Sequence, residues 1–299
     1  MTDVKQLFVP LERQKVTFFI GTLIMLIAGA TIFGARVYLM ALVAIIIAGV
    51  TDLIFALIRG YKLTLSIVIM PIVLVLLLPP TMPLYMVGVG AFFTSFFAKG
   101  VFGGDDKYIF HPATAGVLFL MITFLAYFTT MWLDPITGTV SAATPLGSLA
   151  SGNLDASLWQ LLIGTVPGYT GGTFRIGIIL IGVIFSVLKV IDYRIPLYYI
   201  GSFLIFTLIF NLLAPDTSRD VVMSLFTGNI LFVSVFVAAD PPTTPDYDKS
   251  ILYYGLGLGL ITVVIRHFAA YPEGTIFAVI IMNSVAPLID SFFETEKSS

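Results

Sequence analysis

The chain has 299 residues, of which 58% are hydrophobic and 11% are charged, and its mean hydropathy is +1.03. Soluble domains hold about 25% charged residues, so a water-soluble fold could not cover its surface with this composition. The chain has no cysteine, which excludes thiolate metal sites, cysteine-ligated iron–sulfur clusters and internal disulfides. Its two histidines weigh against a multi-histidine metal site. Its net charge of −2 gives no indication of nucleic-acid binding.

Apolar runs separated by Gly, Pro and charged residues predict ten transmembrane helices. Their expected ranges are 16–34, 37–58, 63–79, 83–98, 112–132, 174–190, 195–213, 221–238, 251–268 and 275–293. The first run is too long for a signal peptide and no A-x-A cleavage site follows it, so we expect an uncleaved first helix. The sequence therefore predicts an all-α polytopic membrane protein.

Basic residues are distributed unequally between the two sides of the membrane, which predicts the orientation. With a cytoplasmic N-terminus, eleven fall inside: Lys5, Arg13, Lys15, Arg59, Lys62, Lys99, Lys107, Lys189, Arg194, Lys249 and Lys297. Four fall outside: Arg36, Arg175, Arg219 and Arg266. This asymmetry and an even number of spans predict that both termini are cytoplasmic.

A long connection, residues 133–173, follows the fifth predicted span on the external side. It contains a polar loop, a short apolar piece at 158–167 and the turn Gly168–Thr173. The apolar piece is too short to span a bilayer and predicts a re-entrant or interfacial half-helix. The connection divides a single membrane domain, 1–299, into five-helix halves at 16–132 and 174–293. Five is odd, so we expect an inverted repeat, although no convincing sequence identity relates the halves.

The polar loop carries the run Ser141-Ala142-Ala143-Thr144-Pro145-Leu146. Composition alone indicates a solvated turn with hydroxyl groups. The run, however, resembles the S-x-A-T motif of the RnfD/NqrB family, the membrane subunits of ion-pumping, flavin-based redox complexes. Other segments resemble the same family, so the similarity covers most of the chain. They are Phe102-Gly103-Gly104, Lys107–Ala113, Ala239–Pro245, Arg266, Tyr271–Gly274, Asn283 and Pro287–Asp290.

The resemblance implies that Thr144 carries FMN through a phosphoester formed by an external flavin transferase. We expect the phosphate to be neutralised by Arg175 or by the turn that ends at Thr173. Ser141, in the same motif, is a further cofactor-binding candidate.

Tyr108 and His111 stand where NqrB has two asparagines, in a region associated there with riboflavin and quinone reduction. They are candidates for binding a second flavin, and the two departures weigh against a quinone site. NqrB also carries an N-terminal extension that this sequence lacks, so RnfD is the better match.

The resemblance to RnfD further implies ferredoxin oxidation coupled to NAD⁺ reduction and to Na⁺ or H⁺ export across a bacterial or archaeal cytoplasmic membrane. The chain would be an electron-transfer subunit that cannot catalyse the reaction alone. Its expected partners are iron–sulfur, NAD-binding and second FMN subunits. The Gly255–Gly259 run does not bind NAD, because it lies within a span and predicts a helix-packing face.

Two carboxylates at membrane depth are candidates for the ion pathway. Asp52 lies late in the second span, and the alternative is a carboxylate that snorkels to the surface. Asp240 ends the eighth span beside two prolines, where freed carbonyls could help bind Na⁺; the alternative is loop capping. His111 is expected to be hydrogen-bonded at a helix interface, and no metal site is predicted.

Two other functions remain open. A small-solute channel or transporter of the urea-channel-like fold fits a five-plus-five arrangement equally well, because fold alone does not decide function. The NqrB-type subunit of a Na⁺-pumping NADH:quinone reductase is the second. Covalent flavin on Thr144 would separate the redox subunit from the channel.

Overall fold

The computed structural model describes residues 12–105, 107–215, 218–269 and 273–294. Its first six helical segments are α1 (Arg13–Phe33), α2 (Arg36–Arg59), α3 (Ser66–Leu76), α4 (Leu84–Phe93), the π-helical η2 (Thr94–Gly100) and α5 (Pro112–Thr123). The middle segments are α6 (Leu125–Thr129), β1 (Trp132–Leu133), β2 (Val140–Ser141), α7 (Pro145–Ala150) and α8 (Leu158–Ile163). The last are α9 (Arg175–Val187), α10 (Arg194–Leu213), α11 (Val221–Phe226), α12 (Ile230–Phe236), the 3₁₀ turn η4 (Pro241–Thr243), α13 (Asp248–Phe268) and α14 (Thr275–Glu294).

The all-α polytopic membrane fold is confirmed. Within the described residues, five helices, α1, α2, α10, α13 and α14, are long and apolar enough to cross a membrane. Four shorter apolar helical segments accompany them: α3, α4 with η2, α5 and α9. Lys5, Lys297, Tyr271 and Pro272, which entered the sequence predictions, lie outside the described residues.

The prediction of ten complete spans is wrong at three places. The predicted span 112–132 is divided between α5 and α6 at Phe124, and at two other places the chain forms half-helices instead. The run 63–79 gives only α3, and the run 221–238 is divided between α11 and α12 by a turn at Gly228, whose φ is +70°. Pro79 and Pro80 follow α3, and Pro241 and Pro242 follow α12. A proline has no N–H to donate to a helix and disfavours helical backbone in the residue before it, so neither apolar run continues as a helix.

The same order of elements occurs twice. In each half, two helices are followed by a half-helix and then by two more helices. The half-helix is α3 among α1 to α5, and it is α12 among α9, α10, α12, α13 and α14. Each half-helix is followed by the same pattern, Pro-Pro-Thr-x-Pro, at 79–83 and at 241–245. This local identity is the signal that the sequence analysis missed. The opposed orientation of the two halves in the bilayer stays a prediction.

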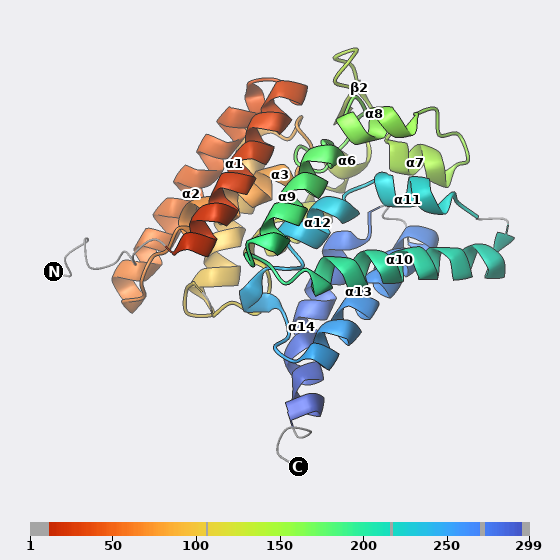
Figure 1. The fold of residues 1–299 in the computed structure, drawn as a ribbon. Helices are drawn as coiled ribbons and strands as arrows, with labels where there is room; N and C mark the ends of the chain where they lie inside the picture. Colours follow the sequence, from red (N-terminus) through yellow and green to blue (C-terminus); the bar gives the residue numbers. More distant parts are fainter. Residues whose placement is uncertain (1–11, 106, 216–217, 270–272, 295–299) are drawn as a thin grey trace.

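The two half-helices form the centre of the bundle, with α1 and α2 on one flank and α10, α13 and α14 on the other (Figure 1). Every residue of α12 is buried. Helices α10 and α13 pack closely because Gly255 and Gly259 face α10: a Cβ on Gly259 would lie 2.0 Å from Ser202 Oγ. The predicted packing face at Gly255–Gly259 is confirmed.

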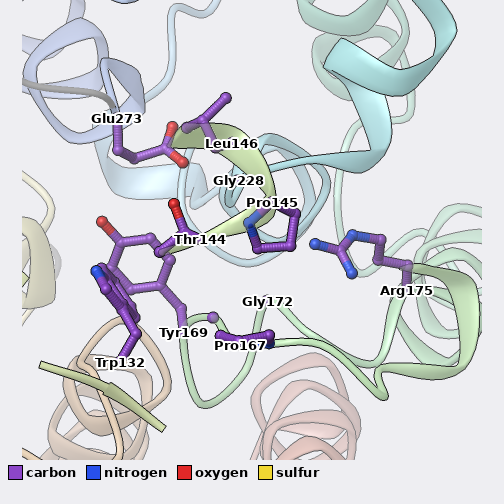
Figure 2. Close-up of a pocket in the computed structure, with 11 residues that line it drawn as sticks. Trp132, Thr144, Pro145, Leu146, Pro167, Tyr169, Gly172, Arg175, Gly228 and Glu273 are labelled. Atoms are coloured by element: carbon purple, nitrogen blue, oxygen red, sulfur yellow. The ribbon is translucent and has the colours of Figure 1, made fainter. Parts of the chain in front are cut away.

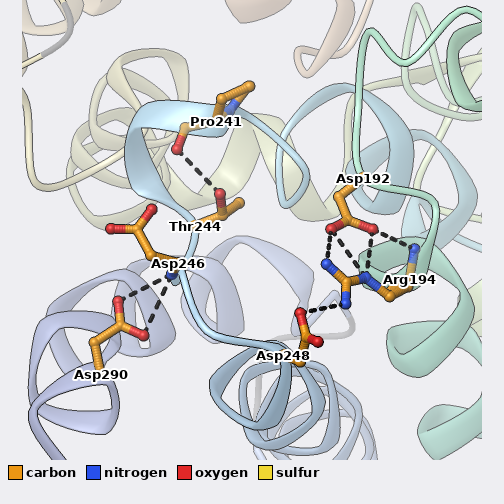
Figure 3. A network of polar contacts seen from close by, with 7 residues as sticks. All are labelled: Asp192, Arg194, Pro241, Thr244, Asp246, Asp248 and Asp290. Atoms are coloured by element: carbon orange, nitrogen blue, oxygen red, sulfur yellow. Dashed lines mark hydrogen bonds and ion pairs between the residues drawn. The ribbon is translucent and has the colours of Figure 1, made fainter. Parts of the chain in front are cut away.

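A polar network joins the starts of α10 and α13 (Figure 3). Arg194 donates from Nη2 to Asp192 Oδ2 at 2.6 Å and from Nη1 to Asp248 Oδ1 at 2.7 Å. The hydrogen bonds from Arg194 hold the pKa of Asp192 below its ordinary value. Nearby, the Asp290 carboxylate accepts the backbone N–H of Asp246. These contacts fix the loop that follows Asp240.

The long connection between the halves folds over one end of the bundle, where α7, α8, β2 and α11 lie together (Figure 1). The apolar piece predicted as a half-helix forms the six-residue α8. The turn after it caps the end of α3, because the N–H groups of Thr170 and Gly171 donate to Leu78 O and Leu76 O at 3.1 and 2.8 Å. The loop is thereby held directly against the end of the half-helix α3.

Candidate functional site

Thr144 is the N-cap of α7, and its hydroxyl is half-buried. Its backbone is extended, and Oγ1 accepts a hydrogen bond from Gly147 N at 3.0 Å. Pro145 occupies the first helical position, where no N–H is needed. Thr at the N-cap followed by Pro is a strong local signal for a helix start, so this sequence itself fixes the position of the hydroxyl.

The Thr144 side chain lies beside a small cavity of about 20 Å³ (Figure 2). Residues from the long connection and from the second half of the chain line it: Trp132, Thr144, Pro145, Leu146, Pro167, Gly168, Tyr169, Gly172, Arg175, Gly228 and Glu273. A water molecule needs roughly 10–15 Å³ of such space. The cavity therefore admits a small polar group and excludes a flavin ring.

Arg175 forms one wall of this cavity, and its guanidinium points toward Pro145 (Figure 2). The side chain is 3% exposed and donates from Nη1 to the carbonyls of Leu161 and Thr173, at 2.6 and 3.1 Å. Among the described residues, no carboxylate lies within 4.0 Å of it. A buried cation held only by carbonyl groups retains the capacity to bind an anion.

Glu273 forms another wall and is paired with Arg266. Its Oε1 lies 3.0 Å from Arg266 Nη2, and its Oε2 accepts the backbone N–H of Asn229 at 2.7 Å. Arg266 also donates to Ser224 O at 2.9 Å and lies over the ring of Phe203. With Arg175 included, the charged groups of the site sum to one positive charge.

Trp132 and Tyr169 supply an aromatic side to the cavity, with ring centroids 4.8 Å apart at an interplanar angle of 76°. Burial and the nearby Glu273 carboxylate raise the pKa of the Tyr169 phenol well above its ordinary value, so it stays protonated. Sequence reasoning named none of these three residues individually, although Tyr169 lies in the Gly168–Thr173 turn and Glu273 in a segment that resembles the family. Only their three-dimensional proximity to Thr144 reveals them.

Two other predicted residues are placed differently. Thr173 is buried and donates from Oγ1 to Tyr169 O at 2.6 Å, so it shapes the turn, while its carbonyl holds Arg175. Ser141 lies on β2, where it pairs with Trp132, and it does not line the cavity. Thr144 and Arg175 are thus brought together, with Thr173 as a support for Arg175.

Tyr108 and Asp240 meet at a second, larger cavity of about 250 Å³, near the start of α1. Tyr108 donates from its hydroxyl to Asp240 Oδ2 at 2.9 Å. Asp240 is also the N-cap residue of η4, where its carbonyl accepts the backbone N–H of Thr243 at 3.0 Å. This cavity does not include Thr144, so Tyr108 and Asp240 belong to a different site from Thr144 and Arg175.

His111 is fully buried at the start of α5. Its backbone N–H donates to Asn283 Oδ1 at 3.1 Å, but neither ring nitrogen has a hydrogen-bond partner among the described residues. The expectation of a hydrogen-bonded interface residue holds for the backbone and is wrong for the ring. Burial lowers the pKa of His111 to about 3, so the imidazole is neutral.

Asp52 belongs to a buried charge cluster. Lys99 Nζ lies 2.5 Å from Asp52 Oδ2 and 2.7 Å from Asp105 Oδ1, and the Lys99 and Asp52 side chains are each 1% exposed. The snorkelling alternative for Asp52 is therefore wrong. Burial alone would raise the pKa of Asp105, but Lys99 and the hydrogen bonds from Thr64 outweigh it and hold that pKa below its ordinary value.

Lys99 was expected in a cytoplasmic loop but lies inside the bundle on η2. A π-helical turn inserts an extra residue and is frequent at functional sites. With two carboxylates and one ammonium group, the cluster carries a formal charge of −1, and Asp52 Oδ1 has no hydrogen-bond partner in the described part of the chain. Such a site favours a proton or a cation.

Known proteins resemble this chain over most of its length. It is 31% identical over 280 residues to a subunit of the proton-translocating ferredoxin:NAD(+) oxidoreductase complex of Clostridium ljungdahlii, covering 89% of this chain and 85% of the relative. It is 30% identical over 231 residues to a subunit of the Na(+)-translocating ferredoxin:NAD(+) oxidoreductase complex of Acetobacterium woodii, covering 76% and 70%.

A subunit of the Na(+)-translocating NADH-quinone reductase of Chromohalobacter salexigens is 30% identical over 277 residues, with 88% of this chain and 66% of the relative covered. A family model described as the NQR2, RnfD, RnfE family matches residues 9–298. The family resemblance noted from the motifs is thereby confirmed, and this multi-pass membrane protein belongs to the NQR2, RnfD, RnfE family.

Proposed function

We propose that the chain is the FMN-bearing electron-transfer subunit of an ion-translocating oxidoreductase complex of the ferredoxin:NAD⁺ type, with FMN attached to Thr144. The relatives are subunits of ion-translocating oxidoreductases, which supports a redox role in general. The observation that carries the specific proposal is the Thr144 hydroxyl beside a cavity that contains Arg175, a buried cation with no carboxylate partner among the described residues.

The charges of the site fit the proposed linkage. FMN joined to a threonine hydroxyl is a phosphodiester, which carries one negative charge. Arg175, Arg266 and Glu273 sum to one positive charge, so the attached phosphate would make the site neutral. Because guanidinium groups bind phosphate oxygens in a fixed geometry, Arg175 is the residue that would hold the phosphate. When bound, FMN supplies the redox chemistry, and the protein supplies attachment and orientation.

The size of the cavity supports a position of the flavin ring outside it. About 20 Å³ accommodates no more than a part of the phosphate group, so the ring would lie outside it, on the face of the loop formed by β2, α7 and α8. A ring at that surface would exchange electrons with a neighbouring subunit. We expect iron–sulfur, NAD-binding and second FMN subunits as partners, because this chain has no cysteine and no dinucleotide-binding fold.

We place the ion-coupling role on two buried carboxylates, Asp52 and Asp240. The cluster of Asp52, Lys99 and Asp105 has a surplus negative charge that a proton or Na⁺ would neutralise. Asp240 lines the larger cavity with Tyr108. That cavity, about 250 Å³, approaches the roughly 300 Å³ of small ligand pockets, and we propose it as the place of a second, non-covalent flavin such as riboflavin.

The test of the covalent flavin compares Thr144→Val with Thr139→Val, a matched change in the same loop. Each chain is produced in a bacterial inner membrane together with a flavin transferase, denatured, and measured by in-gel fluorescence and intact mass. The wild type and Thr139→Val are expected to fluoresce and to carry the mass of one esterified FMN, and Thr144→Val to do neither. Unmodified wild-type protein under these conditions would refute the proposal and favour a small-solute channel.

A further inference from the structure

The two halves of the chain contain equivalent buried ion pairs. In each half the cation lies near the end of the fourth helical segment, and the acid lies in the link to the fifth helix. These pairs are Lys99 with Asp105 and Arg266 with Glu273, at 2.7 and 3.0 Å. In each pair the acid also accepts a backbone N–H just before the half-helix: Thr64 N at 2.9 Å, ahead of α3, or Asn229 N at 2.7 Å, ahead of α12.

The common role of the two pairs is therefore to hold the beginning of a half-helix. Beyond this role their surroundings differ. Asp105 shares its lysine with Asp52, whereas Glu273 shares its arginine, among the residues that the structure describes, with backbone carbonyls and the Phe203 ring. The Lys99 pair lines neither the Thr144 cavity nor the Asp240 cavity, whereas Glu273 is a wall of the Thr144 cavity.

Gly228 is the contact between the Arg266–Glu273 pair and α7, the helix that begins after Thr144. It adopts φ +70°, and a Cβ there would lie 2.3 Å from Glu273 Oε2, 2.7 Å from Arg266 Nη2 and 3.0 Å from Leu146 Cδ2. Leu146 is a buried residue of α7, the helix that Thr144 caps. The turn at Gly228 thus lies between the ion pair and α7, so a displacement of Glu273 would be transmitted to the helix that starts at Thr144.

Glu273 also sets the charge of the site. With Glu273 ionised, the site has one positive charge from Arg175 in excess. Without the Glu273 charge the excess rises to two, and without the Arg266 charge it falls to zero. A reduced flavin carries more negative charge than an oxidised one, so its midpoint potential responds to these changes with a definite sign.

Building on the proposed attachment of FMN to Thr144, we propose that Glu273 is a positioning residue of the flavin site. It holds the turn at Gly228 under α7, and it limits the positive charge that faces the phosphate to one unit. Arg266 is the counter-ion of Glu273. The Lys99–Asp105 pair is the equivalent ion pair in the first half of the chain, where no flavin is proposed.

The experiment measures the midpoint potential of the covalent flavin by optical redox titration of the complete complex, with covalent FMN determined by mass. Glu273→Gln keeps the side-chain shape and the acceptor for Asn229 N, and we expect a more positive potential. Arg266→Gln is expected to shift it negative, and the double variant to return it close to wild type. Asp192→Asn is the control, because this carboxylate pairs with Arg194 and lines neither the Thr144 cavity nor the Asp240 cavity; we expect it to leave the potential unchanged.

Several outcomes would overturn the inference. One is that Glu273→Gln and Arg266→Gln shift the potential in the same direction, and another is that Asp192→Asn shifts it as much as Glu273→Gln. An unchanged potential in a flavin-loaded single variant would do the same. If only one of the two single variants can be purified, the direction in which its midpoint potential differs from that of the double variant still tests the inference. Absence of covalent FMN from the wild type would instead refute the attachment to Thr144, which is a separate result.

Discussion

Removing the Lys99 ammonium group is expected to destabilise the protein strongly. Lys99 lies 2.5 Å from one carboxylate and 2.7 Å from another, and all three side chains are almost fully buried. At such separations each attraction amounts to about 6 kcal/mol with an effective dielectric constant of about 20. Desolvation and the repulsion between Asp52 and Asp105 oppose it. Loss of one partner of a buried pair costs about 3–5 kcal/mol, so we expect Lys99→Met to cost about that much.

The assay is an unfolding titration in detergent with SDS, followed by tryptophan fluorescence. Trp132 is a suitable reporter because it is buried against Tyr169. The control is Lys99→Met combined with Asp52→Asn, which removes one uncompensated charge and is expected to recover a part of the lost stability. A loss below about 1 kcal/mol in Lys99→Met, the range of exposed ion pairs, would refute the reasoning, as would a double variant no more stable than Lys99→Met.

Three further predictions concern other parts of the chain. Because the pKa of His111 is about 3 when folded and about 6.5 when unfolded, only the unfolded chain takes up this proton as the pH falls below 6.5. The free energy of unfolding should then fall by about 1.4 kcal/mol per pH unit. In unfolding titrations at pH 7, 6 and 5, His111→Asn should remove this contribution. If the unfolding free energy of His111→Asn depended on pH as steeply as that of the wild type, the prediction would be contradicted. Asp52→Asn and Asp240→Asn should each reduce ion transport by the complex in proteoliposomes while leaving covalent FMN in place; normal transport by both would show that the ion takes another route. Gly259→Ala places a Cβ 2.6 Å from a backbone nitrogen of α10 and should cost about 1–3 kcal/mol, whereas Gly201→Ala, with nothing within 4 Å, should be nearly neutral by thermal unfolding.

The helices that cross the membrane are predictable from the sequence because hydropathy alone determines them. The half-helices are not, since an apolar run has the same hydropathy whether it is helical or extended. Pro79-Pro80 and Pro241-Pro242 were the available signals for these breaks. Lys99 shows the second limit: its position in the sequence indicated a loop, and its partner Asp52 lies 47 residues away on another helix.

The attachment site was predictable in part. Thr144 and Arg175 stood out because one belongs to a motif and the other is a cation at the start of a helix. Glu273 and Tyr169 lie in segments that were noted in the sequence, but nothing in those segments assigns either side chain to the site. They join the site only because the turn after α8 and the link before α14 meet at the same cavity. Contacts of this kind arise from the topology, which no single segment of the sequence encodes.

The hydrogen bond from Gly147 N to Thr144 Oγ1 has a consequence for maturation. The oxygen that would accept the phosphoryl group is already engaged as a helix cap, and a cap of this type contributes about 1 kcal/mol. With about 1 kcal/mol favouring the capped state, the Thr144 hydroxyl would be free of this hydrogen bond about one fifth as often as the hydroxyl of an unconstrained threonine. A modifying enzyme that needs the free hydroxyl would find it available correspondingly less often. Maturation of the folded chain should therefore be slower than that of an isolated loop peptide, and it should quicken when α7 is weakened.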